Sequence, residues 1–173
     1  MSITFQVEQL VDVWPELIML HKAHWGETEA YRHNQPFAPL LARYMEYECV
    51  NSFVMYTIRD GDKLVGNLGM YFTPSMHTQL LLASEDTLFI LPEYRRGRLA
   101  IDFIKYVEAD CVRRGVSDIE VTAKNDKVGR LMMHLDYQPT AVQYSKQLSR
   151  ADSASPPLAV TETSSDVQMP IST

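Results

Sequence analysis

Residues 88–100 have the sequence LFILPEYRRGRLA. A run of apolar, β-favouring residues stops at Pro92, which cannot continue a central strand. A basic loop with one glycine follows, and the spacing of apolar residues then predicts a helix over 97–115. This order predicts an anion site, because the free N–H groups and the macrodipole of a first helical turn attract negative charge. Three positive charges lie beside it, on Arg95, Arg96 and Arg98. A pyrophosphate would fit here; the alternative is a solvated turn with no ligand.

A β-hairpin and a long strand precede this stretch. The dipeptide Asp60-Gly61 lies between two β-favouring runs, which is a strong hairpin signal. The predicted strands of the first half of the chain cover residues 3–7, 52–58, 64–72 and 79–91. Two helices, over about 7–25 and 40–50, lie between the first two of these strands, and Gly26 is expected to end the first helix.

The second half of the chain predicts a strand-helix-strand unit. After the helix at 97–115, the pattern predicts a strand at 118–122, a helix at 126–135 and a closing strand at 138–148. Such a unit implies a parallel strand pair with a right-handed crossover, whereas the hairpin implies antiparallel neighbours. The predicted fold class is therefore α/β of the α+β type, with a mixed central sheet.

Composition limits the remaining possibilities. The chain has 173 residues, 46% of them hydrophobic, and a formal net charge of −6. We predict one domain over 1–148 and a disordered tail over 149–173, where Ser, Thr and Pro dominate. The acidic balance disfavours an extensive nucleic-acid surface, and no apolar run reaches the roughly 20 residues of a membrane helix. Cys49 and Cys111 form no paired motif, and His21 and His24 have no third ligand at matching spacing, so no metal is expected.

The stretch around Arg95 resembles motif A of the GNAT acyltransferases, usually written Q/R-x-x-G-x-G/A. Arg95 matches its first position and Ala100 its last, while Arg98 stands at the middle glycine and Gly97 lies one place earlier. The next segment is also similar to the family, which has a strand, an Asn and then a helix that ends before an aromatic residue. The matching residues there are Asn125, Leu131, Leu135 and Tyr137. A likeness to GNAT proteins of tailed bacteriophages is also apparent.

The resemblance implies a GNAT fold, with a mixed central sheet of about six to seven strands flanked by about four helices. It implies that acetyl-CoA binds where two parallel strands splay apart, here 85–91 and 118–122, and that no metal takes part. The residues expected to bind the cofactor are Phe89, Ile90, Arg95, Arg96, Gly97, Arg98, Leu99, Ala100 and Asn125. Phe89 and Ile90 would pair through their backbone with the pantetheine amides.

The resemblance also implies the catalytic candidates. Glu85 is the preferred general base, with Asp86 beside it as the second candidate; the alternative is that both are exposed carboxylates at a strand end. Met132 stands where the family often has the tyrosine that protonates the leaving thiolate. Tyr137, on an aromatic position that usually serves packing, is a remaining candidate for that role.

The expected function is transfer of an acetyl group from acetyl-CoA to a primary amine of a small molecule or a protein. The alternative is a weakly active or inactive GNAT-fold protein that binds CoA or a protein partner. A phosphate-binding module of another α/β family is disfavoured, because neither G-x-G-x-x-G nor a Walker pattern is present. We expect a cytoplasmic protein, in the host cytoplasm if a phage encodes it, and exposed sheet edges make a homodimer possible.

Overall fold

A computed structural model describes residues 2–33 and 36–146. The chain divides into a unit that ends at Thr140 and a second that begins at Ala141. The helices and strands of the described residues all belong to the first unit. The predicted disordered tail, 149–173, lies outside the described residues.

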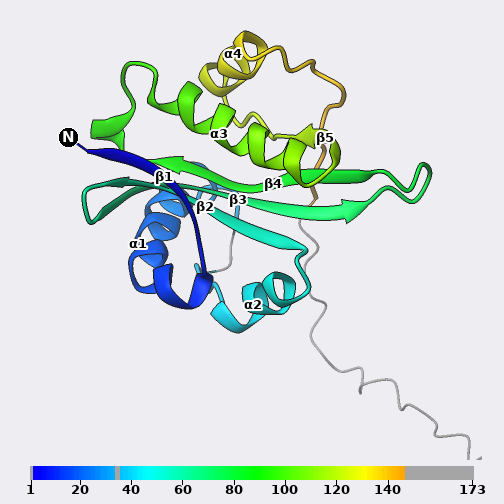
Figure 1. The fold of residues 1–173 in the computed structure, drawn as a ribbon. Helices are drawn as coiled ribbons and strands as arrows, with labels where there is room; N and C mark the ends of the chain where they lie inside the picture. Colours follow the sequence, from blue (N-terminus) through cyan, green and yellow to red (C-terminus); the bar gives the residue numbers. More distant parts are fainter. Residues whose placement is uncertain (1, 34–35, 147–173) are drawn as a thin grey trace, which may run out of the picture. The chain divides into compact units, whose positions relative to one another are not determined.

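One mixed sheet of five strands forms the centre of the first unit (Figure 1). Its strands follow chain order: β1 (Ile3–Glu8), β2 (Phe53–Asp60), β3 (Lys63–Pro74), β4 (Leu81–Ile90) and β5 (Val116–Glu120). The first four strands pair antiparallel, and β4 pairs parallel with β5. The predicted mixed sheet, hairpin and parallel pair are therefore confirmed.

Helices cover both faces of the sheet. The helices α1 (Leu10–Thr28) and α2 (Leu41–Cys49) lie on one face, and α3 (Leu99–Arg113) and α4 (Asp126–His134) lie on the other (Figure 1). A short 3₁₀ turn, η1 (Pro92–Tyr94), links β4 to α3. In the described part of the chain the four predicted helices are thus present.

Two apolar clusters hold these layers together, one on each face. The cluster beneath α3 includes Tyr56, Ile58, Val65, Met70, Phe103 and Val107. The cluster beneath α1 includes Leu10, Val13, Leu17, Phe53, Met55 and Phe89. The buried residues of each helix recur at helical spacing, which is why the sequence pattern located both helices.

The described residues differ from the sequence prediction in three places. The helix α1 runs to Thr28, beyond Gly26, because its last turn is held by contacts from distant segments. The helix α3 begins at Leu99, because Gly97 adopts a left-handed conformation with φ of 64°. The predicted closing strand is absent over 138–146, where Pro139 removes a backbone donor. The described sheet consequently has fewer than the predicted six to seven strands.

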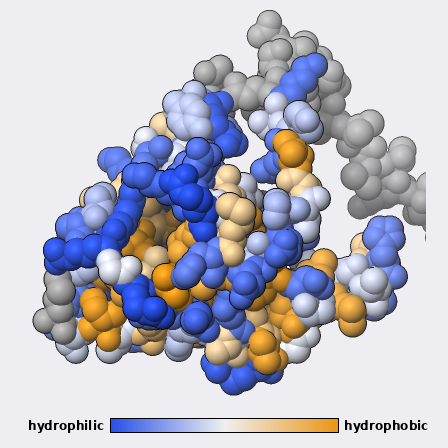
Figure 2. All heavy atoms as spheres, turned by 90° about the horizontal axis from the view of Figure 1, so that it is seen from above, coloured by the Kyte–Doolittle hydropathy of each residue, from blue (hydrophilic) through white to orange (hydrophobic). Residues whose placement is uncertain are grey.

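The surface that carries α3 and α4 is mostly hydrophilic. Figure 2 looks onto this face and shows hydrophobic atoms at the bottom of a hollow that hydrophilic side chains frame. In the described residues no helix has the length and apolar character needed to cross a membrane.

Candidate functional site

The strands β4 and β5 separate partway along their length. They pair from Leu81 with Val116 to Ser84 with Glu120, and β4 then continues to Ile90 beyond the last paired residue of β5. The remaining part of β4 has an open edge on the side of β5. The predicted splay of two parallel strands is therefore present, and it begins at Glu85.

A β-bulge lies at the point of separation. Met70 of β3 pairs with Glu85, and the adjacent Gly69 pairs with Thr87, so Asp86 is the extra residue. The side chains of Glu85 and Asp86, at the bulge, have different hydrogen-bond partners. The carboxylate of Asp86 accepts a hydrogen bond from the Tyr44 hydroxyl of α2 at 3.3 Å. Sequence alternation alone could not predict this, because a bulge interrupts the two-residue period.

The Glu85 carboxylate lies where the two strands part. It accepts a hydrogen bond from the backbone N–H of Thr122 at 3.3 Å and another from the N–H of Leu88. Burial raises the pKa of Glu85, and the nearby charge of Asp86 raises it further, while the two N–H donors oppose the shift. Glu85 is therefore a partly buried carboxyl group, unlike the exposed strand-end carboxylate that was the alternative.

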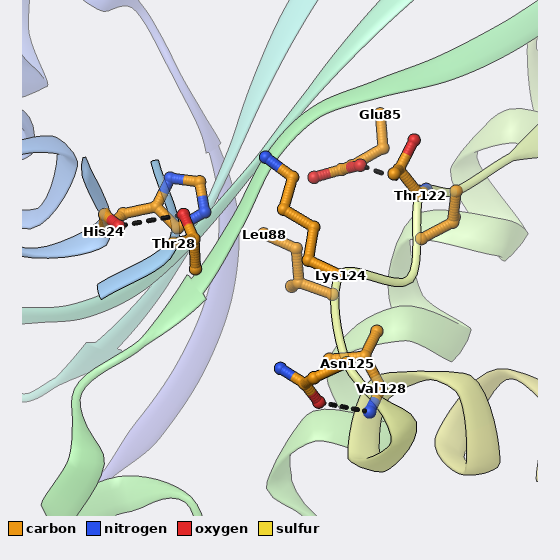
Figure 3. Close-up of a pocket in the computed structure, with 9 residues that line it drawn as sticks. His24, Thr28, Glu85, Leu88, Thr122, Lys124, Asn125 and Val128 are labelled. Carbon is orange, nitrogen blue, oxygen red and sulfur yellow. Dashed lines mark hydrogen bonds between the residues drawn. The ribbon is translucent and has the colours of Figure 1, made fainter. Parts of the chain in front are cut away.

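A small cavity of about 40 Å³ lies at this separation (Figure 3). The strand β4, the helix α1, the segment that joins β5 to α4 and the first turn of α4 contribute to its wall. The lining residues are His24, Thr28, Glu85, Leu88, Val121, Thr122, Lys124, Asn125 and Val128. The cavity therefore brings the predicted base, Glu85, together with the predicted cofactor residue Asn125.

The end of α1 is bound to the segment that follows β4 and to the segment that follows β5. The carboxylate of Glu27 forms a two-point ion pair with Arg95, with distances of 2.6 and 2.7 Å. Glu29, the residue that follows α1, pairs with the ammonium of Lys124. Neither contact could be predicted from the sequence, because the partners lie far apart along the chain.

Arg95 is the most constrained of the three loop arginines. Besides pairing with Glu27, its Nε donates to the Ile90 carbonyl at 2.6 Å, and its guanidinium lies 4.9 Å from the centre of the Phe89 ring. The N–H of Leu91 donates to the carbonyl of Val65 in β3. The Ile90 carbonyl belongs to the same peptide group and points the opposite way, to the open edge of β4. Arg95 therefore already binds the Ile90 carbonyl, one of the backbone groups expected to pair with pantetheine.

The N-terminus of α3 has free hydrogen-bond donors. The backbone N–H groups of residues 97–101 have no hydrogen-bond partner in the described part of the chain, and the first helical bond is that of Asp102 to Arg98. No side chain caps this helix. Gly97 is left-handed, and a Cβ placed on it would meet nothing within 4 Å. These free donors, with the exposed Arg96 and Arg98 beside them, fit a diphosphate group.

The remaining sequence candidates lie toward α4. The side-chain oxygen of Asn125 accepts from the N–H groups of Lys127 and Val128, at 3.0 and 3.1 Å, and so caps α4. Met132 is buried, with 6% of its surface exposed. The Tyr137 hydroxyl bonds to Glu108 of α3, and burial with this bond raises its pKa. Tyr137 is not among the residues that line the cavity.

A buried polar group beneath α1 was not predicted as part of the site. The Asn67 amide lies 3.0 Å from the Thr87 hydroxyl and 3.5 Å from His21 Nε2. His24 packs against Phe89 and reaches the cavity. Burial lowers the pKa of each histidine to about 4, so both are neutral at pH 7. Within the described ranges no cluster of three or more His, Cys, Asp or Glu side chains could hold a metal ion.

No protein-family model matches the chain, and no curated protein matches it. Several solved structures do match the chain. An aminoglycoside acetyltransferase from an uncultured soil metagenomic sample, in complex with sisomicin, has a TM-score of 0.69 at 15% identity, over 84% of this chain and 96% of that one. A ribosomal-protein-alanine N-acetyltransferase from Brucella melitensis biovar Abortus 2308 has a TM-score of 0.68 at 15% identity, over 86% and 100%.

A predicted acetyltransferase from Clostridium acetobutylicum, solved with acetyl-CoA, has a TM-score of 0.68 at 15% identity, over 84% of this chain and 96% of that chain. These likenesses, at low identity over nearly whole chains, show that the described residues have the fold of GNAT acetyltransferases.

Proposed function

We propose that this chain transfers the acetyl group of acetyl-CoA to a primary amine by direct attack in a ternary complex. The observation that carries the proposal is the row of free backbone N–H groups at residues 97–101, in the segment that follows the unpaired part of β4. A helix N-terminus with unpartnered donors and two exposed arginines is suited to a diphosphate. The fold that it shares with a structure solved with acetyl-CoA supports the same cofactor.

The chain's own residues would have three tasks. The N–H groups at 97–101 and the side chains of Arg96 and Arg98 would hold the diphosphate of acetyl-CoA, which supplies the activated thioester. The open edge of β4 would orient the pantetheine arm as an added strand. Glu85 would accept the proton that the attacking amine loses, and its raised pKa brings it closer to the neutral pH at which a base is useful.

An assay of acetyl-CoA consumption tests this function. The full chain is incubated with acetyl-CoA and pooled primary amines, including a polyamine, an aminoglycoside and a peptide with a free N-terminus, and released thiol is measured. Thiol release that depends on an added amine and falls in the Glu85→Gln variant supports the proposal. Thermal stability that is unchanged by CoA, together with no thiol release, contradicts it, because a ligand that binds the native state stabilises it.

A second function rests on Met132. This residue is buried and has no proton to donate, although the resemblance places the family's frequent proton-donating tyrosine there. A chain that binds CoA without catalysis would retain the stabilisation by CoA and release no thiol with any amine. The two readouts of the same assay therefore separate an acetyltransferase from a CoA-binding protein.

A further inference from the structure

Lys124 extends from the segment between β5 and α4 into the cavity at the strand separation. Its side chain lines this cavity together with His24 and Glu85. Figure 3 shows its amino end directed across the cavity, and in that view it lies between the imidazole of His24 and the carboxylate of Glu85. Only 22% of the side chain is exposed, and its ammonium pairs with Glu29, the residue that follows α1. An amine of the chain thus occupies the cavity that contains the proposed base.

The other lysines in the first unit are placed differently. Lys22, Lys63, Lys105 and Lys127 are exposed, and none of them lines this cavity. Lys127, in the first turn of α4, is the nearest of these to Lys124 along the chain and provides a matched reference. Burial also lowers the pKa of Lys124, which increases the fraction of the neutral, nucleophilic amine.

We infer that Lys124 is an acceptor of its own chain: when acetyl-CoA is bound, the enzyme acetylates the Nζ of Lys124. This inference rests on the proposed function. The Lys124 ammonium first releases a proton to water, the Nζ lone pair then forms a bond to the thioester carbonyl carbon, and the carbon–sulfur bond breaks with its electron pair on sulfur. The nitrogen gives its proton to Glu85, and the proton then passes to the thiolate. The products are Nζ-acetyl-lysine, CoA thiol and the proton released from the ammonium, so atoms and charges balance.

Acetylation would change the site. The ammonium of Lys124 is lost, and its ion pair with Glu29 is lost with it. The end of α1 would then keep the ion pair of Glu27 with Arg95 and would no longer be bound to the segment before α4. The modified chain would carry an acetylated amine where an external acceptor has to approach Glu85, so we expect slower turnover of external amines.

Isotope labelling and mass spectrometry test the inference on the full chain. The protein is incubated with acetyl-CoA that carries a ¹³C-labelled acetyl group, digested, and the label on Lys124 is compared with the label on Lys127. We expect Lys124 to be labelled about tenfold faster or more, since holding the amine in the cavity makes the reaction intramolecular. The rate constant should not depend on protein concentration, and Glu85→Gln should lower it.

Two variants are controls for the position of the label. Lys124→Arg keeps the charge that pairs with Glu29 and should abolish the label at that position, whereas Lys127→Arg should leave the labelling of Lys124 unchanged. Stabilisation by CoA is measured in the same samples. Binding of CoA with Lys124 unlabelled, or with label spread over the exposed lysines, overturns this inference and leaves the proposed function standing. No binding of CoA overturns both.

Discussion

At the scale of single residues, Glu85 has a structural role and a proposed catalytic role, and one variant can separate them. Its carboxylate accepts hydrogen bonds from one N–H group of β4 and from one in the segment that follows β5, so it helps to hold the chain where the strands part. It is also the partly buried carboxyl group that we propose as the general base. A structural role depends on hydrogen bonding alone, whereas a catalytic role depends on proton transfer.

We predict that Glu85→Gln removes the acid limb of the pH–rate profile. The base acts only when ionised, and because its folded pKa is raised, the rate of the unmodified enzyme should fall as pH drops toward that raised pKa. The variant should be at least as stable near pH 7, since a raised carboxyl pKa means that ionisation disfavours the folded state. An identical pH profile in the variant would assign the base to another group.

Gly97 gives a second test at this scale. We predict that Gly97→Ala lowers the free energy of unfolding by about 1 kcal/mol, because alanine resists the left-handed conformation that the loop requires. Affinity for acetyl-CoA should fall as the amides lose their alignment. The control is Gly26→Ala inside α1, where a Cβ meets nothing and alanine should instead stabilise the helix by up to about 1 kcal/mol. Chemical denaturation measures both changes.

At the scale of elements, the start of α3 is where charge should matter most. We predict that Arg96→Ala combined with Arg98→Ala weakens acetyl-CoA binding at least tenfold, since each lost charged hydrogen bond contributes about 1.5–3 kcal/mol. Both side chains are exposed, so the melting temperature without ligand should hardly change. Calorimetric titration measures the affinity. Unchanged affinity in the double variant would remove these side chains from the cofactor site.

The last turn of α1 predicts a different pattern. We expect Glu27→Gln to reduce stability by only about 0.5–1 kcal/mol, because its ion pair with Arg95 is partly exposed and screened by solvent. Its effect on acetyl-CoA reveals what Arg95 does. Weaker binding would mean that Glu27 positions the loop through Arg95, and tighter binding would mean that Glu27 competes with the diphosphate for Arg95.

The same elements show what the sequence could predict. The hairpin, the helix α3 and the parallel pair have local signals: Asp60-Gly61, helical spacing, and a strand-helix-strand order. The bulge at Asp86 and the extension of α1 through Gly26 depend on tertiary contacts, namely pairing with β3 and the ties to Arg95 and Lys124. Those contacts place Lys124 and His24 at the cavity, which explains why neither was recognised as part of the site from the sequence.

At the scale of the whole molecule, the two buried histidines predict acid sensitivity. Burial lowers their folded pKa values from 6.5 to about 4, so the unfolded chain binds more protons between these values. The stability that they contribute is present above pH 6.5 and is lost as pH falls toward 4, by an amount on the order of 1–3 kcal/mol per histidine. Unfolding by denaturant from pH 7 to pH 4.5 measures the slope.

A matched pair of variants checks the source of that slope. His21→Gln with His24→Gln should flatten the loss of stability between pH 6.5 and 4, and His33→Gln, a substitution at a partly exposed side chain that stacks on Trp25, serves as the control. A slope that is the same in the histidine double variant would show that carboxyl groups, and not these imidazoles, control acid unfolding.

The central claim is that a diphosphate binds the free amides where α3 begins. An amide ¹H–¹⁵N spectrum recorded during titration with acetyl-CoA tests it at those atoms. We predict saturable shifts for the amides of Gly97, Arg98, Leu99, Ala100 and Ile101, and much smaller shifts with S-acetylpantetheine, which lacks the diphosphate. Amides at 97–101 that stay in place while acetyl-CoA binds elsewhere, or that respond equally to both ligands, would contradict the account.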